Sequence, residues 1–250
     1  MQIGAALAAV TGIIEISLRN TIACILDEAF RIPEWLLSPP APFHWHELEM
    51  RAIQRAIRSA KKAHYAKLNH IERRALDTLA FPSGVPAGIR HETRVRQRQD
   101  TIEVTRGRII AELSLNFWKR LFASEYEDLL WKRALRKAFP DKSIARAQVA
   151  ANLEVIYQTR NRVAHHEFVR GERLYETLRA MDFVAAAFRA RRTSNRMILA
   201  KLLMQHRTNL DQVIERFGSA AALPSTALGP NVRTSFVRDD EVNSEQLQFE

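Results

Sequence analysis

Residues 144–165 of the chain read IARAQVAANLEVIYQTRNRVAH, and this stretch decides the fold. On a helical wheel, where each residue turns by about 100°, its apolar residues cluster within about 60° of one direction. These residues are Val149, Leu153, Ile156, Val163 and Ala164. The stretch is therefore predicted to form a helix that buries this face.

A polar motif interrupts the helix near its end, where residues 160–167 read RNRVAHHE. Arg160 lies at the centre of the apolar face on the wheel. An unpaired guanidinium is costly to bury, so this position predicts a partner: a carboxylate of the fold, a second subunit or a phosphate. Asn161 and His165, four residues apart, share an adjacent face. One turn thus offers a permanent cation, an amide and an imidazole, the group that changes charge near neutral pH.

Composition narrows the class of protein. The chain has 250 residues, of which 46% are hydrophobic, and this is enough to bury a core. Its 38 basic and 28 acidic residues give a net charge of +10, which favours nucleic acid as a partner, then an anionic membrane surface. An ordinary basic soluble protein is the alternative. Cys24 is the only cysteine, which excludes an intrachain disulfide and favours the cytosol.

The N-terminal stretch, residues 1–14, is apolar but lacks the basic start and the cleavage site of a signal peptide. Glu15 and Arg19 interrupt the apolar run before it is long enough to cross a bilayer. We therefore expect a buried helix, a cytoplasmic protein and no membrane partner.

Nothing in the sequence predicts a sheet, so the expected class is all-α. A Pro-rich loop is expected at residues 33–42, and a polar insert at 82–106 is expected to be mobile or irregular. We predict one domain over residues 1–218 and a flexible tail over 219–250. Helices are expected at residues 2–30, 45–79 (one helix or two), 109–123, 125–138, 144–165, 173–190 and 194–217.

The polar motif contains the groups that a metal-free ribonuclease needs. Such an enzyme uses a base for the ribose 2′-hydroxyl, a donor for the leaving 5′-oxygen and positive charge beside the phosphate. His165 supplies an imidazole, and the guanidinium of Arg160 can hold two phosphate oxygens at once. A structural arginine beside a surface histidine is the alternative interpretation, because such spacings also arise by chance. Asn161 and the second histidine, His166, distinguish this pair.

The motif Arg160-Asn161-x3-His165 resembles the RNxxxH motif of the HEPN superfamily, and the string RNRVAHHE is similar to the form in Abi-like (abortive infection) bacterial proteins. Residues 15–20, 112–118 and 126–140 also resemble that family in order and spacing. Together the similar segments span residues 10–170. Phe168 and Val169 stand where the family often has proline.

This resemblance implies a HEPN-type helical bundle in which the motif is the site of a metal-independent endoribonuclease without a cofactor. Arg160 would bind the scissile phosphate, His165 would act as acid or base, and Asn161 would fix the geometry. The motifs of two chains would meet in a homodimer. The products would be a 2′,3′-cyclic phosphate and a 5′-hydroxyl.

The resemblance further implies a toxin or antiphage effector that a cognate inhibitor, a protein or an RNA, restrains. A catalytically inactive RNA-binding or adaptor protein of the same kind is the alternative.

Several residues are candidates for supporting roles in the site. Glu15 and Arg19 are one helical turn apart and are expected to pair with each other. The alternative is a functional role, in which Glu15 orients Arg160 or Arg19 lines the cleft. His166 and Glu167 complete the motif, and His166 is turned by about 100° from His165.

The basic residues of the predicted helix at 45–79 are candidates for contact with an RNA backbone, and a solvated charged face is the alternative. The candidates are Arg55, Arg58, Lys61 and Lys62, together with Arg162 of the motif. His44 and His46 form only a weak pattern for a metal, and we expect none.

Overall fold

The computed structural model describes residues 2–139, 141–188 and 194–221. Every regular element in this part of the chain is helical, which confirms the predicted all-α class. The elements are α1 (Gln2–Phe30), α2 (Glu47–Lys67), α3 (His70–Ala80), α4 (His91–Asp100), α5 (Arg106–Glu112), α6 (Leu115–Arg120), η1 (Ser124–Tyr126), η2 (Glu127–Trp131), η3 (Leu135–Ala138), α7 (Arg146–Ala164), α8 (Glu172–Phe188) and α9 (Ser194–Ala221).

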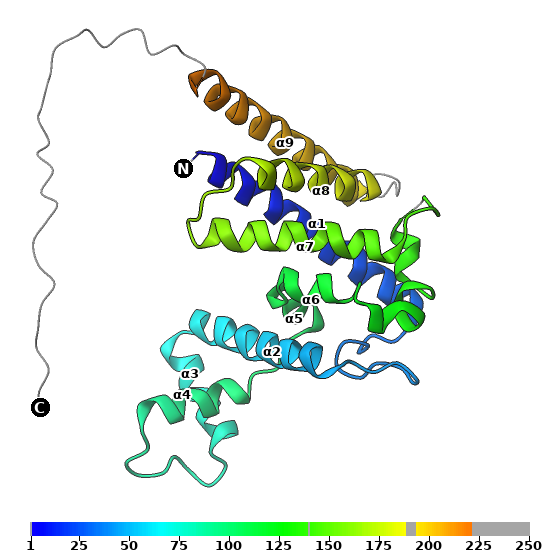
Figure 1. Ribbon diagram of the computed structural model, residues 1–250. Helices are drawn as coiled ribbons and strands as arrows, with labels where there is room; N and C mark the ends of the chain where they lie inside the picture. Colours follow the sequence, from blue (N-terminus) through cyan, green and yellow to red (C-terminus); the bar gives the residue numbers. More distant parts are fainter. Residues whose placement is uncertain (1, 140, 189–193, 222–250) are drawn as a thin grey trace, which may run out of the picture.

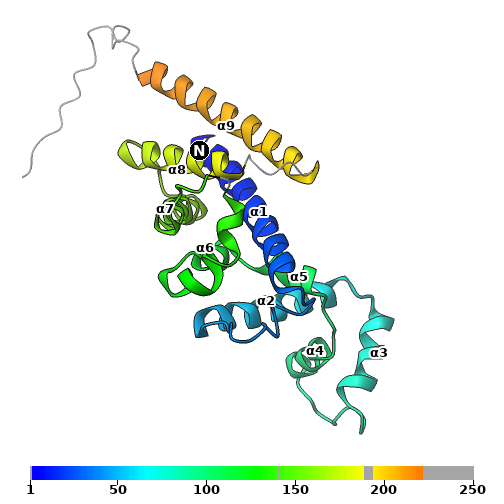
Figure 2. The same cartoon turned by 90° about the vertical axis from the view of Figure 1, so that its right-hand side faces the viewer.

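The helices form two groups joined by α5 and α6 (Figures 1 and 2). Helices α7, α8 and α9 lie along α1 at one end of the molecule, and α2, α3 and α4 lie at the other. Helix α9 continues to Ala221, so residues 219–221 of the expected tail are helical, and residues 222–250 lie outside the described residues. The α7–α9 group carries the polar motif, while the α2–α4 group carries the basic residues of the predicted RNA-contacting helix.

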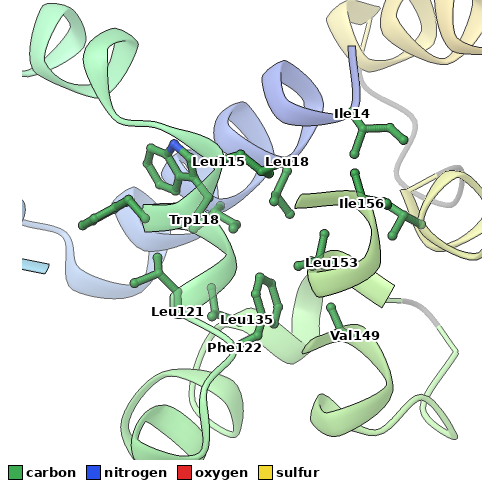
Figure 3. Close-up of a cluster of buried hydrophobic side chains, with 14 of the residues drawn as sticks. Ile14, Leu18, Leu115, Trp118, Leu121, Phe122, Leu135, Val149, Leu153 and Ile156 are labelled. Carbon is green, nitrogen blue, oxygen red and sulfur yellow. The ribbon is translucent and has the colours of Figure 1, made fainter. Parts of the chain in front are cut away.

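Helix α7 buries the apolar face that the sequence predicted, over the first half of the helix. Val149, Leu153 and Ile156 are at most 1% exposed. Figure 3 shows them beside Ile14 and Leu18 of α1 and beside the aromatic turns that follow α6. Because protein interiors are close-packed, this contact fixes both the axis of α7 and its rotation about that axis.

Helix α1 is the central core helix of this group. It contacts α6, α7, α8, α9 and η3. In the described part of the chain it is also the one helix long and apolar enough to cross a membrane, but 56% of its most apolar stretch is buried inside the protein. Its apolar surface is thus used largely for packing against the other helices.

Residues 106–138 form short helices and turns, whereas the sequence predicted two longer helices at 109–123 and 125–138. The difference follows from the aromatic side chains, of which Phe117, Trp118, Phe122 and Tyr126 are at most 1% exposed. At 100° per residue they would point in widely different directions from one straight helix. Breaking the chain into short turns lets all of them enter the core.

Helix α4 lies within the insert that was expected to be irregular. It has no buried residue, and so its sequence shows no apolar periodicity. Asp77 of α3 holds it instead, because the Asp77 carboxylate accepts hydrogen bonds from Arg94 at 2.5 Å and from Arg98 at 2.6 Å. The Asp77 side chain is only 12% exposed. Hydrogen bonds from Arg98 and Arg94 lower the pKa of Asp77 well below its usual range.

Replacing Asp77 with Asn removes the charge that holds both arginines, so we expect the backbone amides of α4 to exchange with solvent faster than in the wild type. Exchange in α1 and α7 should not change. Hydrogen exchange near neutral pH measures this, and Asp100→Asn, which removes a charge from α4 without touching Asp77, is the control. Equal exchange of α4 in both variants would contradict the role of Asp77.

Acidification should have a related effect on the wild type. The pKa of Asp77 is lower in the folded protein than in the unfolded chain, where it is about 3.9. Its stabilising contribution is therefore complete above that unfolded value and is lost as the pH falls below it.

Candidate functional site

The polar motif forms the C-terminal end of α7, and its backbone closes the helix in a Schellman arrangement. The N–H of Glu167 donates to the carbonyl of Arg162 at 2.8 Å, and the N–H of His166 donates to the carbonyl of Val163 at 3.1 Å. Arg162 and Glu167 also pair through their side chains at 3.1 Å. This ion pair stands where such caps commonly have an apolar contact.

His166 has a backbone φ of +59°, in the left-handed region that glycine usually occupies at this position of a helix cap. The strain of a left-handed residue with a Cβ is about 1–2 kcal/mol. His166 is thus the residue at which the chain turns away from α7, and His165 is the last residue before that turn.

Arg160 is not buried, contrary to the prediction from the helical wheel. Its side chain is 43% exposed, and Ala164 is exposed as well. Phe122 and Leu135 lie beside Val149 and Leu153, in the first half of α7 (Figure 3). Near its C-terminal end the buried side of α7 faces α8 instead, where Thr159 hydrogen-bonds Thr177 at 2.7 Å.

Glu15 of α1 is the partner of Arg160, which agrees with one of the two expected roles of Glu15. The distance between Arg160 Nε and Glu15 Oε2 is 3.8 Å, which is an ion pair but not a hydrogen bond. Arg19 donates from Nη1 to the carbonyl of Ala111 at 3.0 Å. It therefore fastens α1 to the end of α5, and the described part of the chain shows no ion pair between Glu15 and Arg19.

The side chains of Arg160, Asn161 and His165 lie within the last turn and the cap of α7. Asn161 is half-buried, whereas Arg160 and His165 are exposed. In the described part of the chain none of the three side chains makes a hydrogen bond. Apart from the ion pair of Arg160 with Glu15, the polar groups of these three side chains are available to a ligand.

Two further residues lie on this side of α7 and were not predicted from the sequence: Tyr157 of α7 and Lys119 of α6. Tyr157 is four residues before Asn161 and eight before His165, so the three side chains form one row along the helix. The ammonium group of Lys119 lies 4.5 Å from the centre of the Tyr157 ring and pairs with Glu154. The spacing of Tyr157 could have identified it from sequence, but the place of Lys119, on α6, could not be read from spacing.

The other predicted RNA-contacting residues lie elsewhere in the molecule. Arg55 lines a cavity of about 180 Å³ between α2 and α6, together with the buried Glu49 and with Arg120, which pairs with Glu49. Arg58, Lys61 and Lys62 line a larger groove between α2 and α4. The structure thus brings Arg160, Asn161 and His165 together and places the α2 cations at the other end of the molecule (Figure 1).

The cavities described in the chain contain no motif residue. A third cavity, of about 220 Å³, lies between α1, α8 and α9. Arg160 and His165 are themselves exposed, so these two side chains of the motif lie at the surface of the chain. No group of three or more His, Cys, Asp or Glu side chains within residues 2–139, 141–188 and 194–221 is arranged to hold a metal ion.

Comparisons with known proteins return nothing for this chain: no protein-family model matches it, and no curated protein or solved structure does so either.

Replacing His166 with Gly should stabilise the protein by about 0.5–1 kcal/mol, because glycine relieves the left-handed strain and loses part of that gain in the more flexible unfolded chain. Urea unfolding measures the change in the free energy of unfolding. His166→Ala, which keeps the Cβ and the strain, is the control and should bring no gain. A loss of stability in His166→Gly would show that the imidazole itself supports the cap.

Proposed function

We propose that the protein is a metal-independent endoribonuclease whose catalytic residues are Arg160, Asn161 and His165. The observation that carries this proposal is that these side chains share the end of α7 and have no hydrogen-bond partner in the described part of the chain. The resemblance of the motif to the RNxxxH motif of Abi-like HEPN proteins supports the same chemistry. Neither a metal nor a cofactor is part of the proposal.

In the proposed reaction the ribose 2′-oxygen attacks the adjacent phosphorus, and the bond from phosphorus to the 5′-oxygen breaks. An imidazole removes the 2′-hydroxyl proton, and an acid protonates the leaving 5′-oxygen. Arg160 neutralises the charge that grows on the phosphate oxygens, and Asn161 holds one reacting group in place. The products carry a 2′,3′-cyclic phosphate and a 5′-hydroxyl.

Glu15 keeps Arg160 in position without occupying its hydrogen-bond donors. At 3.8 Å the carboxylate attracts the guanidinium but accepts no hydrogen bond from it. The N–H groups of Arg160 therefore remain free for two oxygens of a phosphate. In this role Glu15 is a positioning residue.

A homodimer completes the proposed site. One chain supplies a single His165 on an open surface, whereas the reaction needs both a base and an acid. A second copy would bring the second imidazole and would enclose the phosphate. Phe168, directly after the motif, is 83% exposed, and Ile16, next to Glu15, is 39% exposed, so apolar surface is available to a second copy beside the motif.

Such an enzyme would act as a cytoplasmic toxin or antiphage effector, without a membrane partner. A nuclease that cuts the RNA of its own cell must be restrained, so the proposal includes a cognate inhibitor, either a protein or an RNA. The family resemblance motivates this part of the proposal.

A catalytically inactive RNA-binding or adaptor protein is the second candidate. It is favoured by the negative charge of Glu15 beside Arg160, which repels a phosphate, and by the separation of the α2 cations from the motif. Binding that falls steeply with salt, with no cleavage and no effect of Arg160→Ala, would identify it.

Expression of the wild type in a bacterium should stop growth and generate RNA fragments with 2′,3′-cyclic phosphate ends. His165→Ala should lower the cleavage rate by about 100-fold or more, because an acid–base group contributes about that much. His44→Ala, at an exposed histidine away from the motif, is the matched control and should leave cleavage unchanged. Mapping the RNA ends decides the matter: equal cleavage by wild type and His165→Ala rules out the proposed site.

A further inference from the structure

The groove between α2 and α4 is a second site with ligand-binding character. Its volume is about 630 Å³. The charged residues that line it are Arg58, Lys61, Lys62, Arg96, Glu92 and Asp100. Arg58, Lys61 and Lys62 are spaced three and four residues apart and so share one face of α2. Arg96 faces them from α4, so the groove has cations on both walls.

Within the described residues, the cations of the groove form no ion pair, unlike the neighbouring arginines of α4. Arg94 and Arg98 of α4 both pair with Asp77, which also fixes α4 beside α3. In the described part of the chain Arg58, Lys62 and Arg96 form no ion pair, and Lys61 donates only to the backbone carbonyl of Asp100, at 2.6 Å. Arg94 and Arg98 thus fix α4 in place, and Arg96, which lies between them in the sequence, lines the groove.

The lining of the groove distinguishes between polyanion classes. Val95 is the one apolar residue among those that line it. Protein–protein interfaces need an apolar centre to be stable, whereas binding of nucleic acid is dominated by contacts between cations and phosphates. The groove lacks an apolar centre and has unpaired cations. Its chemistry therefore fits a phosphate backbone better than an acidic protein.

We propose that the α2–α4 groove binds the phosphate backbone of RNA and anchors long RNA while the motif acts on a distant linkage. This inference rests on the proposed ribonuclease function for the nature of the ligand. Helices α5 and α6 separate the groove from α7 (Figures 1 and 2). A long RNA engages both surfaces and a short one does not, so the groove raises the effective concentration of long RNA at the motif.

Binding of fluorescent single-stranded RNA tests the groove directly. The RNA has about 40 nucleotides, long enough for several cation–phosphate contacts, and the protein carries His165→Ala so that the RNA stays intact. The groove variant carries Arg58→Gln, Lys62→Gln and Arg96→Gln. The matched control carries Arg133→Gln, Lys137→Gln and Lys142→Gln, which remove the same charge from exposed positions away from both sites.

We expect the groove variant to bind RNA about 10- to 100-fold more weakly at about 0.1 M salt, and the slope of log affinity against log salt to fall by about 2. The control variant should lower the RNA affinity and the salt slope by less than the groove variant does. Equal affinities of the groove variant and the control would overturn the proposal, and an acidic protein would then be the better candidate for the groove. Arg96→Glu alone, at one exposed residue of α4, should weaken binding in the same direction and guards against misfolding of the triple variant.

Cleavage rates separate this proposal from the proposed nuclease function. With His165 intact, the groove variant should cut the long RNA more slowly but cut a hexanucleotide at the wild-type rate. If the wild type cuts no RNA while the groove variant still loses affinity, the nuclease proposal fails and the groove stands. If cleavage occurs and the groove variant cuts both RNAs like the wild type, the groove proposal fails alone.

Discussion

The packing of the apolar face of α7 against α1 and the aromatic turns is the constraint on which the candidate site depends. Val149, Leu153 and Ile156 fix the rotation of α7, and this rotation determines where every later residue of the helix points. Arg160 is seven residues after Leu153 and points in nearly the same direction from the helix axis. It lies about 10 Å further along the helix, where the core no longer covers this side. Arg160 therefore meets Glu15 and solvent rather than apolar side chains.

The end of α7 adds the second constraint. A Schellman cap with His166 in the left-handed region ends the helix at Ala164 and turns the chain towards α8. The cap uses the backbone of Arg162 and Glu167 and joins their side chains in an ion pair. Structural roles thus account for His166, Arg162 and Glu167. Arg160, Asn161 and His165 are then the motif residues whose side chains make no hydrogen bond within the described part of the chain.

Sequence reasoning succeeded where one physical effect controls the local structure. The long apolar helices α1 and α7 were predicted because burial of one face imposes a period of 3.6 residues. Helix α4 was missed because ion pairs with Asp77 stabilise it, and such pairs join residues of two different helices. The short helices and turns of residues 106–138 were not predicted. Aromatic residues are buried from several faces of this segment, so its sequence does not show where the helices break.

The candidate site could be predicted only as far as local helical structure determines it. The motif residues are adjacent in sequence, so their proximity required only a helix. The burial of Arg160 was predicted wrongly, because a helical wheel assumes that the same neighbour covers one face along its whole length. The place of Lys119 beside Tyr157 and the groove made by α2 and α4 depend on tertiary packing, which periodicity does not contain.

The central claim is that an RNA phosphate binds at the end of α7. The most direct test is to follow the imidazole resonances of His165 by NMR during titration with an RNA whose 2′-hydroxyls are all methylated, so that it binds but cannot be cleaved. Assignment comes from His165→Ala, and His44 is the internal reference. The account predicts a saturable shift of the His165 signals, lost in Arg160→Ala, with little change at His44. Unchanged His165 signals at RNA concentrations that saturate the protein would contradict it.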